Sequence, residues 1–263
     1  MNYLIKLVVV LSLATMFSCR SSQELIYLKD AADNELINGL PIKMTEHILK
    51  EGDILYISIK TMNAEVNMLY NPESNMEGNA SSVGYQKFTT PSGAYLYGFE
   101  IDPDGFVKLP MLGDIKVAGV PVSQVESIVQ KKADEFINDA IVKVKMLNFK
   151  ITVAGEVRSP GVYYNYSNTV TAIEALAMAG GNTDFASITN IMVVRKTAES
   201  NHSYMLDLSS KNVYASKGFY LQPNDYIIVQ PDKHKNFQLN SQAYSLMFSS
   251  LGMLLAVLGF VLK

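Results

Sequence analysis

The 263-residue sequence has no tryptophan and a single cysteine, Cys19, so the folded chain contains no internal disulfide and depends on burial and hydrogen bonding. It also lacks any basic block longer than Lys131-Lys132, and 22 Lys and Arg against 25 Asp and Glu give a net charge of −3. Nucleic-acid-binding proteins concentrate positive charge on one surface. The composition therefore argues against a nucleic acid as the partner. A chain of this length is expected to hold two or three modest domains.

The short motifs of common catalytic and nucleotide-binding sites are missing as well. There is no Gly-x-Ser-x-Gly elbow and neither glycine-rich phosphate loop, G-x-x-x-x-G-K-[ST] or G-x-G-x-x-G. His47, His202 and His234 are far apart and lack the spacing or cysteine neighbours of a zinc site. We therefore predict that the chain is not an enzyme and has no catalytic residues, no metal site and no cofactor.

Charge is absent along the whole C-terminal tail, from Asn236 to Leu262. Its most apolar part, Ser245–Leu262, would form a helix about 27 Å long, close to the thickness of a bilayer core. A buried core helix is the alternative, but such a helix normally has a polar face that carries charge. Residues 236–263 are therefore predicted to form a C-terminal membrane helix.

The N-terminus has the composition of an export signal. A short basic start precedes the apolar run Leu7–Phe17, which is too short to span a bilayer, and Ser18 and Cys19 follow. The arrangement resembles the bacterial lipoprotein signal, in which the cysteine is acylated and becomes the first mature residue. An ordinary signal peptide with a chance cysteine is the alternative. We predict a signal peptide over residues 1–18, lipidation at Cys19 and a lipid-anchored segment over 19–44.

Between these ends, short strands, tight turns and two helices alternate. The capping boxes at 123–126 and 171–174 predict helices that end near Ile137 and at Gly180-Gly181. Residues 61–93 are rich in Asn, Ser, Gly and Met and are predicted to be an irregular insertion. Strands are predicted at Ile54–Ile59, Tyr95–Ile101, Phe106–Pro110, Ile115–Ala118, Ile141–Phe149, Ile151–Val157, Val162–Tyr166, Ile191–Arg195, Tyr204–Leu208 and Tyr226–Val229.

Two pairs of charged residues could mark sites. Asp102 and Asp104 are close enough for a metal or acid–base pair, but Asp-Pro-Asp-Gly is typical of a tight turn, and we favour the turn. Glu156 and Arg158 flank another turn and could meet a sugar or a neighbouring chain. A surface ion pair between them is the simpler interpretation.

Five stretches together resemble the outer-membrane polysaccharide export lipoproteins of the Wza type. They occur in that family's order and near its spacing: LKEGDILYISI (Leu49–Ile59), IDPDGFVKLPMLGDIKVAGV (Ile101–Val120), VAGEVRSPGVY (Val153–Tyr163), AIEALAMAGG (Ala172–Gly181) and LQPNDYIIV (Leu221–Val229). The resemblance implies an α+β chain. A small mixed polysaccharide-export domain (45–149, with the insertion 61–93) precedes a soluble-ligand-binding β-grasp domain (150–231). The chain departs from the family in that insertion and in having one β-grasp module where some members have two.

The same resemblance implies a function. Copies anchored at Cys19 would form an oligomeric channel at the outer membrane, with soluble domains in the periplasm, and capsular or exopolysaccharide would pass through it. The resemblance also implies an inner-membrane polysaccharide co-polymerase as partner. The alternative is a monomeric envelope lipoprotein that binds glycan through its β-grasp domain, and a third hypothesis, a polysaccharide-modifying enzyme, has no motif in its favour.

Small or polar residues recur along the tail about every 3.5 positions, with bulky residues between them. This seam could line a pore or let neighbouring helices approach closely, or it could only reflect how common Ser and Gly are in membrane helices. A wet lumen suits its first half and close packing its second half. The seam comprises Gln242, Ser245, Ser249, Gly252, Ala256 and Gly259.

Overall fold

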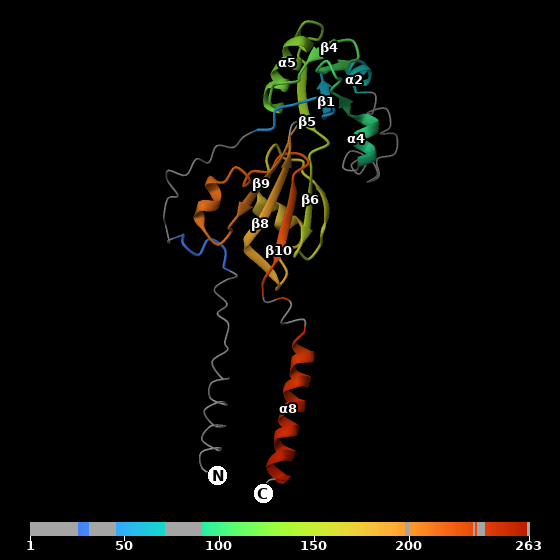
Figure 1. Cartoon of the computed structure of the whole chain (residues 1–263). Coiled ribbons are helices and arrows are strands. Elements are labelled where there is room, and N and C mark those ends of the chain that lie inside the picture. Colours follow the sequence, from blue (N-terminus) through green and yellow to red (C-terminus); the bar gives the residue numbers. More distant parts are fainter. Residues whose placement is uncertain are drawn as a thin grey trace.

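The computed structural model describes residues 26–31, 46–71, 91–197, 200–233, 235 and 240–261. The predicted signal peptide, Cys19 and residues 72–90 of the predicted insertion lie outside the described residues. Figure 1 shows a three-stranded domain at one end of the molecule, a five-stranded domain in the middle and helix α8 at the other end.

The three-stranded domain is an antiparallel sheet of order β2-β1-β5, with helix α5 packed on β5. Period-two alternation decides which side chains of β5 enter the core, since Val142, Val144 and Met146 are buried and Lys143 is exposed. The helix contributes Val125, Val129 and Ala133 to the same core. The elements are β1 (Ile54–Lys60), β2 (Phe99–Glu100), β5 (Ile141–Met146), α5 (Val122–Asp134) and the hairpin β3 (Phe106–Leu109) with β4 (Gly113–Lys116).

Two helices occur where the sequence predicted an irregular insertion and the start of a strand. Helix α2 (Ala64–Tyr70) lies within the predicted insertion. A helix begins here because the side chain of Asn63 caps it by accepting from the N–H groups of the first turn. Helix α4 (Pro91–Tyr97) includes the first three residues of the predicted strand Tyr95–Ile101, and the strand itself is only Phe99–Glu100, so the first part of that prediction was wrong. Pro91 at the first helical position favours this start, whereas the aromatic pattern of Tyr95 and Tyr97 indicated a strand.

A buried asparagine fastens α2 to the sheet. Strand β2 pairs only with the first two residues of β1, which leaves the later part of that edge open. The Asn71 amide fills this place: its Oδ1 accepts from the Ile59 N–H (3.1 Å) and its Nδ2 donates to the Ile59 carbonyl (2.6 Å). The side chain thus stands in for a neighbouring strand.

The capping box predicted at the start of α5 does not form. The helix begins at Val122 after Pro121, which makes no side-chain cap, so Ser123 already lies inside the first turn. Its hydroxyl donates instead to the Glu46 carboxylate (2.7 Å), and Glu126 accepts from the backbone N–H of Val144 (3.4 Å). The predicted N-cap, Ser123, lies two residues after the observed N-cap, Pro121.

The five-stranded domain has the strand order β7-β6-β10-β8-β9, with β6 and β10 parallel and the other pairs antiparallel. Helix α6 packs on β6, and its predicted capping box at Thr171 and Glu174 is confirmed. Gly155 ends β6 with φ +87°, and a Cβ there would lie 2.1 Å from the Val229 carbonyl oxygen, so this close crossing requires glycine. The elements are β6 (Lys150–Gly155), β7 (Gly161–Tyr164), α6 (Ala172–Met178), β8 (Ala186–Lys196), β9 (Asn201–Leu206), the 3₁₀ helix η4 (Lys211–Ala215) and β10 (Tyr226–Pro231).

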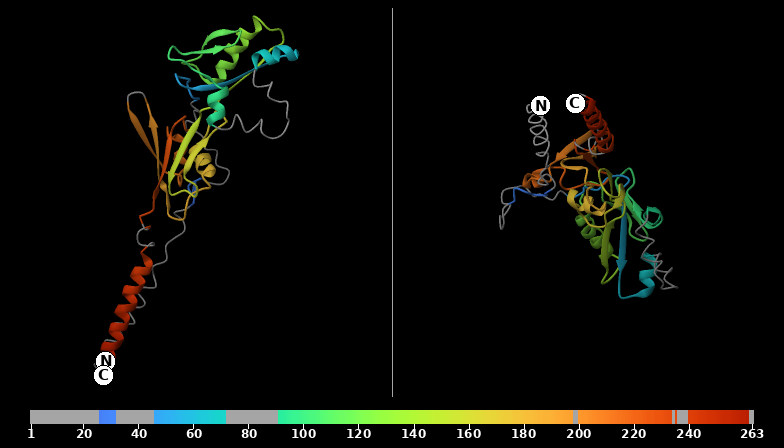
Figure 2. Two further views of the ribbon diagram at one scale, coloured as in Figure 1. Left: turned by 90° about the vertical axis from the view of Figure 1, so that its right-hand side faces the viewer. Right: turned by 90° about the horizontal axis from the view of Figure 1, so that it is seen from below.

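Helix α8 (Ser241–Val261) extends away from both sheets, and it keeps large apolar side chains exposed, including Phe248 (71%) and Phe260 (85%) (Figures 1 and 2). Of the helices in the described part of the chain, none is long and apolar enough to cross a membrane. The predicted membrane span is therefore unsupported. Serine and glutamine recur through the first half of α8, and the stretch without them, Leu251–Val261, is only about 16 Å long against a bilayer core of about 30 Å.

Candidate functional site

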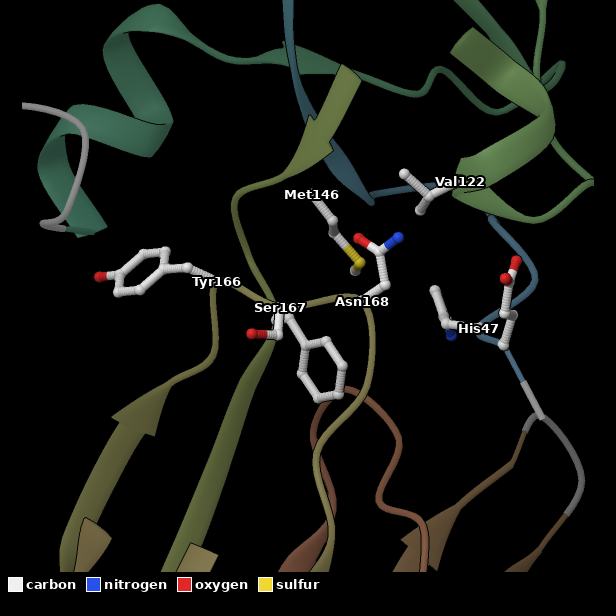
Figure 3. A pocket seen from close by; sticks show the side chains of 8 residues that line it. His47, Val122, Met146, Tyr166, Ser167 and Asn168 are labelled. Carbon is white, nitrogen blue, oxygen red and sulfur yellow. The ribbon is translucent and has the colours of Figure 1, made fainter. Parts of the chain in front are cut away.

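One pocket lies where the two domains meet, and it is too small for a ligand. Side chains from both domains point into it in Figure 3, yet its volume is about 10 Å³, room for about one water molecule. His47 lines it and bonds the Asp53 carboxylate through Nε2 (2.7 Å), and that carboxylate also accepts from the Lys50 N–H (2.9 Å). We interpret this pocket as part of the packing between the domains.

A second pocket, on the five-stranded domain, encloses about 290 Å³. This is close to the lower end of the range for small-molecule sites, about 300 Å³. We call it the Asn182 pocket. Five of its eight lining residues have polar side chains, and the lining comes from three separate parts of the chain: Tyr27, Arg158, Gly180, Gly181, Asn182, Thr183, Asp184 and Ile188.

The sequence builds this pocket by ending α6 sharply. Gly180 and Gly181 have φ of +77° and +82°, and their N–H groups bond the carbonyls of Ala177 (3.0 Å) and Leu176 (2.9 Å), which is a Schellman cap. The reversed chain then runs beside the segment that follows β6, where the Arg158 N–H donates to the Gly181 carbonyl (3.0 Å). This pairing brings Arg158 and Asn182 to the same pocket.

The charges beneath the pocket differ from the predicted ion pair. The Glu156 carboxylate accepts from the Thr183 hydroxyl (2.7 Å) and from the Lys235 ammonium, not from Arg158. Hydrogen bonds from Lys235 and then Thr183 hold the pKa of Glu156 below its ordinary value. Arg158 is exposed, and its guanidinium has no hydrogen-bond or ion-pair partner among the described residues. The expected Glu156–Arg158 pair was therefore wrong.

Asn182 is left with an unpaired polar atom. Its Nδ2 donates to the Tyr27 hydroxyl (2.8 Å), whereas its Oδ1 is buried and has no partner in the described part of the chain. If the amide is turned round, the nitrogen becomes the unpaired atom instead. Leaving such a group unsatisfied costs about 1–3 kcal/mol, so it favours a ligand or water that can bond it.

Tyr27 reaches the pocket because residues 26–31, here the N-terminal segment, dock on the five-stranded domain. The N–H groups of Leu28 and Lys29 donate to the carbonyls of Leu208 (2.9 Å) and Ser209 (2.8 Å). The Asp30 carboxylate accepts from the Ser210 hydroxyl and the Lys211 N–H, both at 2.7 Å. Figure 1 shows the blue segment beside the orange turn of η4. The sequence did not predict this docking, because a segment of six residues is too short to show a periodic pattern.

Asp30 makes the docking of the N-terminal segment pH-dependent. Hydrogen bonds from the Ser210 side chain and then the Lys211 backbone lower the pKa of Asp30 below 3.8. The contribution of Asp30 to docking is therefore complete at a pH above its ordinary pKa, and it is lost as the pH falls through the lower pKa that Asp30 has in the docked segment. We expect acidification to about pH 3, or Asp30→Asn at neutral pH, to lower the exchange protection of the Leu28 and Lys29 amides.

The control for this prediction is Asp104→Asn, which changes an exposed aspartate in the other domain. It should leave the protection of both amides unchanged. If protection in Asp30→Asn equals that in the unaltered chain at neutral pH, the Asp30 carboxylate does not hold the segment.

The remaining candidate residues do not join this pocket. Asp102 forms the predicted turn, because its Oδ1 accepts from the N–H groups of Asp104 (3.1 Å) and Phe106 (2.8 Å). His202 contacts Ser200 (3.2 Å), and His234 lies outside the described residues. The seam residues all lie on α8, where Ser249 donates to the Ser245 carbonyl (2.7 Å) and Gly252 and Gly259 have nothing within 4 Å of an added Cβ.

Comparison with known proteins finds two family matches along the chain and relatives that are named for polysaccharide export or transport. Residues 43–147 match the family described as polysaccharide biosynthesis/export protein, and residues 149–229 match the SLBB domain. The EPS I polysaccharide export outer membrane protein EpsA of Ralstonia nicotianae is 26% identical over 182 residues, which is 67% of this chain and 45% of the relative. The polysialic acid transport protein KpsD of Escherichia coli is 30% identical over 149 residues, 54% of this chain and 26% of the relative. The chain thus spans less than half the length of these two relatives.

Proposed function

We propose that this chain, which belongs to the outer-membrane polysaccharide export family, carries capsular or exopolysaccharide to the cell surface without catalysing a reaction. The observation that carries the proposal is the pair of family matches, which adjoin and together cover residues 43–229 in order. The relatives are named as an export and a transport protein, which supports transport rather than chemistry.

We further propose that the protein acts at the outer membrane, with its two domains in the periplasm. The name of the Ralstonia relative includes the outer membrane, and the predicted lipid anchor at Cys19 would hold the N-terminal segment close to it. Export needs a source of energy, and the sequence contains no nucleotide-binding motif. An inner-membrane polysaccharide co-polymerase is the partner that the family resemblance implies.

An assembly of several copies is favoured over a monomer. Neither pocket described above is a passage for a polymer, since their volumes are about 10 and 290 Å³. Helix α8 exposes apolar side chains along its length, and an exposed apolar surface of this kind marks a contact with another molecule. We propose that copies meet through α8, with the small residues of the seam at the contact or along the passage between copies.

Deleting the gene tests the proposed function. The deletion strain is expected to lose polysaccharide from the cell surface, measured by staining intact cells, and to regain it when the gene is returned. Undiminished staining in the deletion strain would contradict export.

The mass of the protein extracted in several mild detergents distinguishes an assembly of several copies from a monomer. A particle of one chain under every condition would favour the monomeric alternative.

The lipid anchor gives a separate prediction. The chain is expected to incorporate labelled fatty acid at Cys19, and Cys19→Ser should abolish the label, because the thiol is the acylated group. The variant should also move from the membrane fraction to the soluble fraction, because several acyl chains hold a protein firmly and their loss removes that hold. Ser21→Ala, two positions away, is the control and should be labelled like the unaltered chain. Equal labelling of Cys19→Ser and the unaltered chain would show that Cys19 is not lipidated.

A further inference from the structure

We propose that the Asn182 pocket is a saccharide-binding site in which the docked N-terminal segment supplies one wall, the side chain of Tyr27. The proposal rests on the proposed function for the presence of polysaccharide at this domain. Its chemistry comes from the pocket itself.

The unpaired atom of the Asn182 amide is the first argument. A buried amide atom without a partner gains most from a ligand that can bond it, and a sugar hydroxyl both donates and accepts. A hydroxyl that reaches this buried atom therefore satisfies Asn182 in either orientation of the amide. An apolar ligand would leave the amide as it is, so the pocket selects for polar ligands.

The two charged residues at the rim are the second argument. Arg158 has a guanidinium without a partner among the described residues, and Asp184 is an exposed carboxylate. One side chain offers donors and the other only acceptors, and their charges cancel. A phosphate group at Arg158 would also face the carboxylate of Asp184, whereas neighbouring hydroxyls of one sugar ring can bond both. The pair thus favours a hydroxyl-rich ligand over a nucleotide or inorganic phosphate.

The backbone and Tyr27 complete the site. Gly181 has nothing within 4 Å of an added Cβ, and an added Cβ at Gly180 would lie 3.3 Å from the Arg158 side chain, so the absence of side chains keeps this wall of the pocket bare. Tyr27 is 41% exposed and offers part of its ring face, on which the apolar face of a sugar can pack. The Tyr27 hydroxyl is protonated at neutral pH like that of any tyrosine, and burial raises its pKa further.

Binding and docking of the N-terminal segment are then coupled. A ligand that contacts Tyr27 binds the docked form better than the undocked form, so it must stabilise docking. Because the segment follows the predicted anchor at Cys19, a saccharide in the pocket would hold the five-stranded domain close to the lipid surface. We therefore expect saccharide to raise the exchange protection of the Leu28 and Lys29 amides.

Saturation-transfer NMR on the purified full chain tests the site, because it observes weakly bound ligand directly. The probe is a set of short fragments of the organism's own surface polysaccharide, and maltohexaose serves as a neutral comparison. We expect the fragments to bind, and Asn182→Leu and Arg158→Gln each to weaken binding about tenfold, the loss expected for one good hydrogen bond. The matched control is Asn190→Leu, on the same domain, whose exposed amide bonds Ser187 and Thr189.

The outcomes separate the site from the function. Fragments that do not bind the unaltered chain, or that bind both variants as tightly as the control, overturn the pocket. Arg158→Gln covers the risk that Asn182→Leu misfolds, because Arg158 is exposed and its removal leaves no buried group unpaired. If gene deletion removes the surface polysaccharide but both variants bind the fragments as tightly as the unaltered chain, the proposed binding site is wrong and the proposed export function stands. If the deletion strain keeps its surface polysaccharide, the proposed export function is wrong instead.

Discussion

Replacing Arg195 with methionine is expected to lower the free energy of unfolding of the five-stranded domain by about 3–5 kcal/mol. The Arg195 guanidinium on β8 makes a bidentate pair with Asp225, with Nη2 2.7 Å from Oδ2 and Nε 3.1 Å from Oδ1. Nη2 also donates to the Tyr220 carbonyl (2.9 Å). Asp225 is only 1% exposed, so removing its partner would leave a buried, uncompensated charge. Urea unfolding, followed by the exchange of β8 and β10 amides, measures the loss.

Two further variants show whether the pair or the packing is responsible. Arg195→Met combined with Asp225→Leu removes both charges and should be more stable than Arg195→Met alone, because no carboxylate is left stranded. Lys196→Met, the exposed neighbour on the same strand, should change stability by less than about 0.5 kcal/mol. A loss below about 1 kcal/mol in Arg195→Met would mean that the ion pair contributes no more than a surface pair.

Local signals predicted the parts of the fold in which neighbouring residues decide the structure. The Asp102 turn and the Thr171 capping box depend on residues within four positions of each other, and both formed as predicted. The alternation along β5 likewise follows from the two-residue period. Errors arose where two local signals competed, as at Tyr95, where aromatic residues that favour strands follow a proline that favours a helix start.

The candidate site was harder to predict, because its residues meet only in the folded chain. Tyr27, Arg158 and Asn182 come from separate segments, and the contact between Tyr27 and Asn182 spans 155 positions. The sequence indicated that Arg158 and Glu156 could meet a sugar or a neighbouring chain, but it favoured an ion pair between them. In the structure Lys235, from a segment after the last strand, is the partner of Glu156. The one local signal was Gly180-Gly181, which predicted the helix end but not the pocket that the bare turn leaves open.

The largest expected effect on function belongs to α8. Gly252→Leu combined with Gly259→Leu should abolish assembly and surface polysaccharide, while the proposed lipid anchor at Cys19 should keep the protein at the membrane. The two glycines lie on one side of the helix, seven residues apart, with nothing within 4 Å of an added Cβ. If neighbouring copies approach closely there, two leucines would force the helices apart. Leucine is also a better helix former than glycine, so α8 itself would not be weakened.

Two measurements test this double variant: the mass of the detergent-extracted protein reports assembly, and staining of intact cells reports export. The control is Met247→Phe with Leu254→Phe, which enlarges exposed side chains on the opposite side of the helix and should preserve both assembly and export. Unchanged assembly and unchanged surface polysaccharide in the glycine variant would contradict the seam. Intact assembly with lost export would instead place Gly252 and Gly259 along the passage, because bulky side chains would then narrow it without separating the copies.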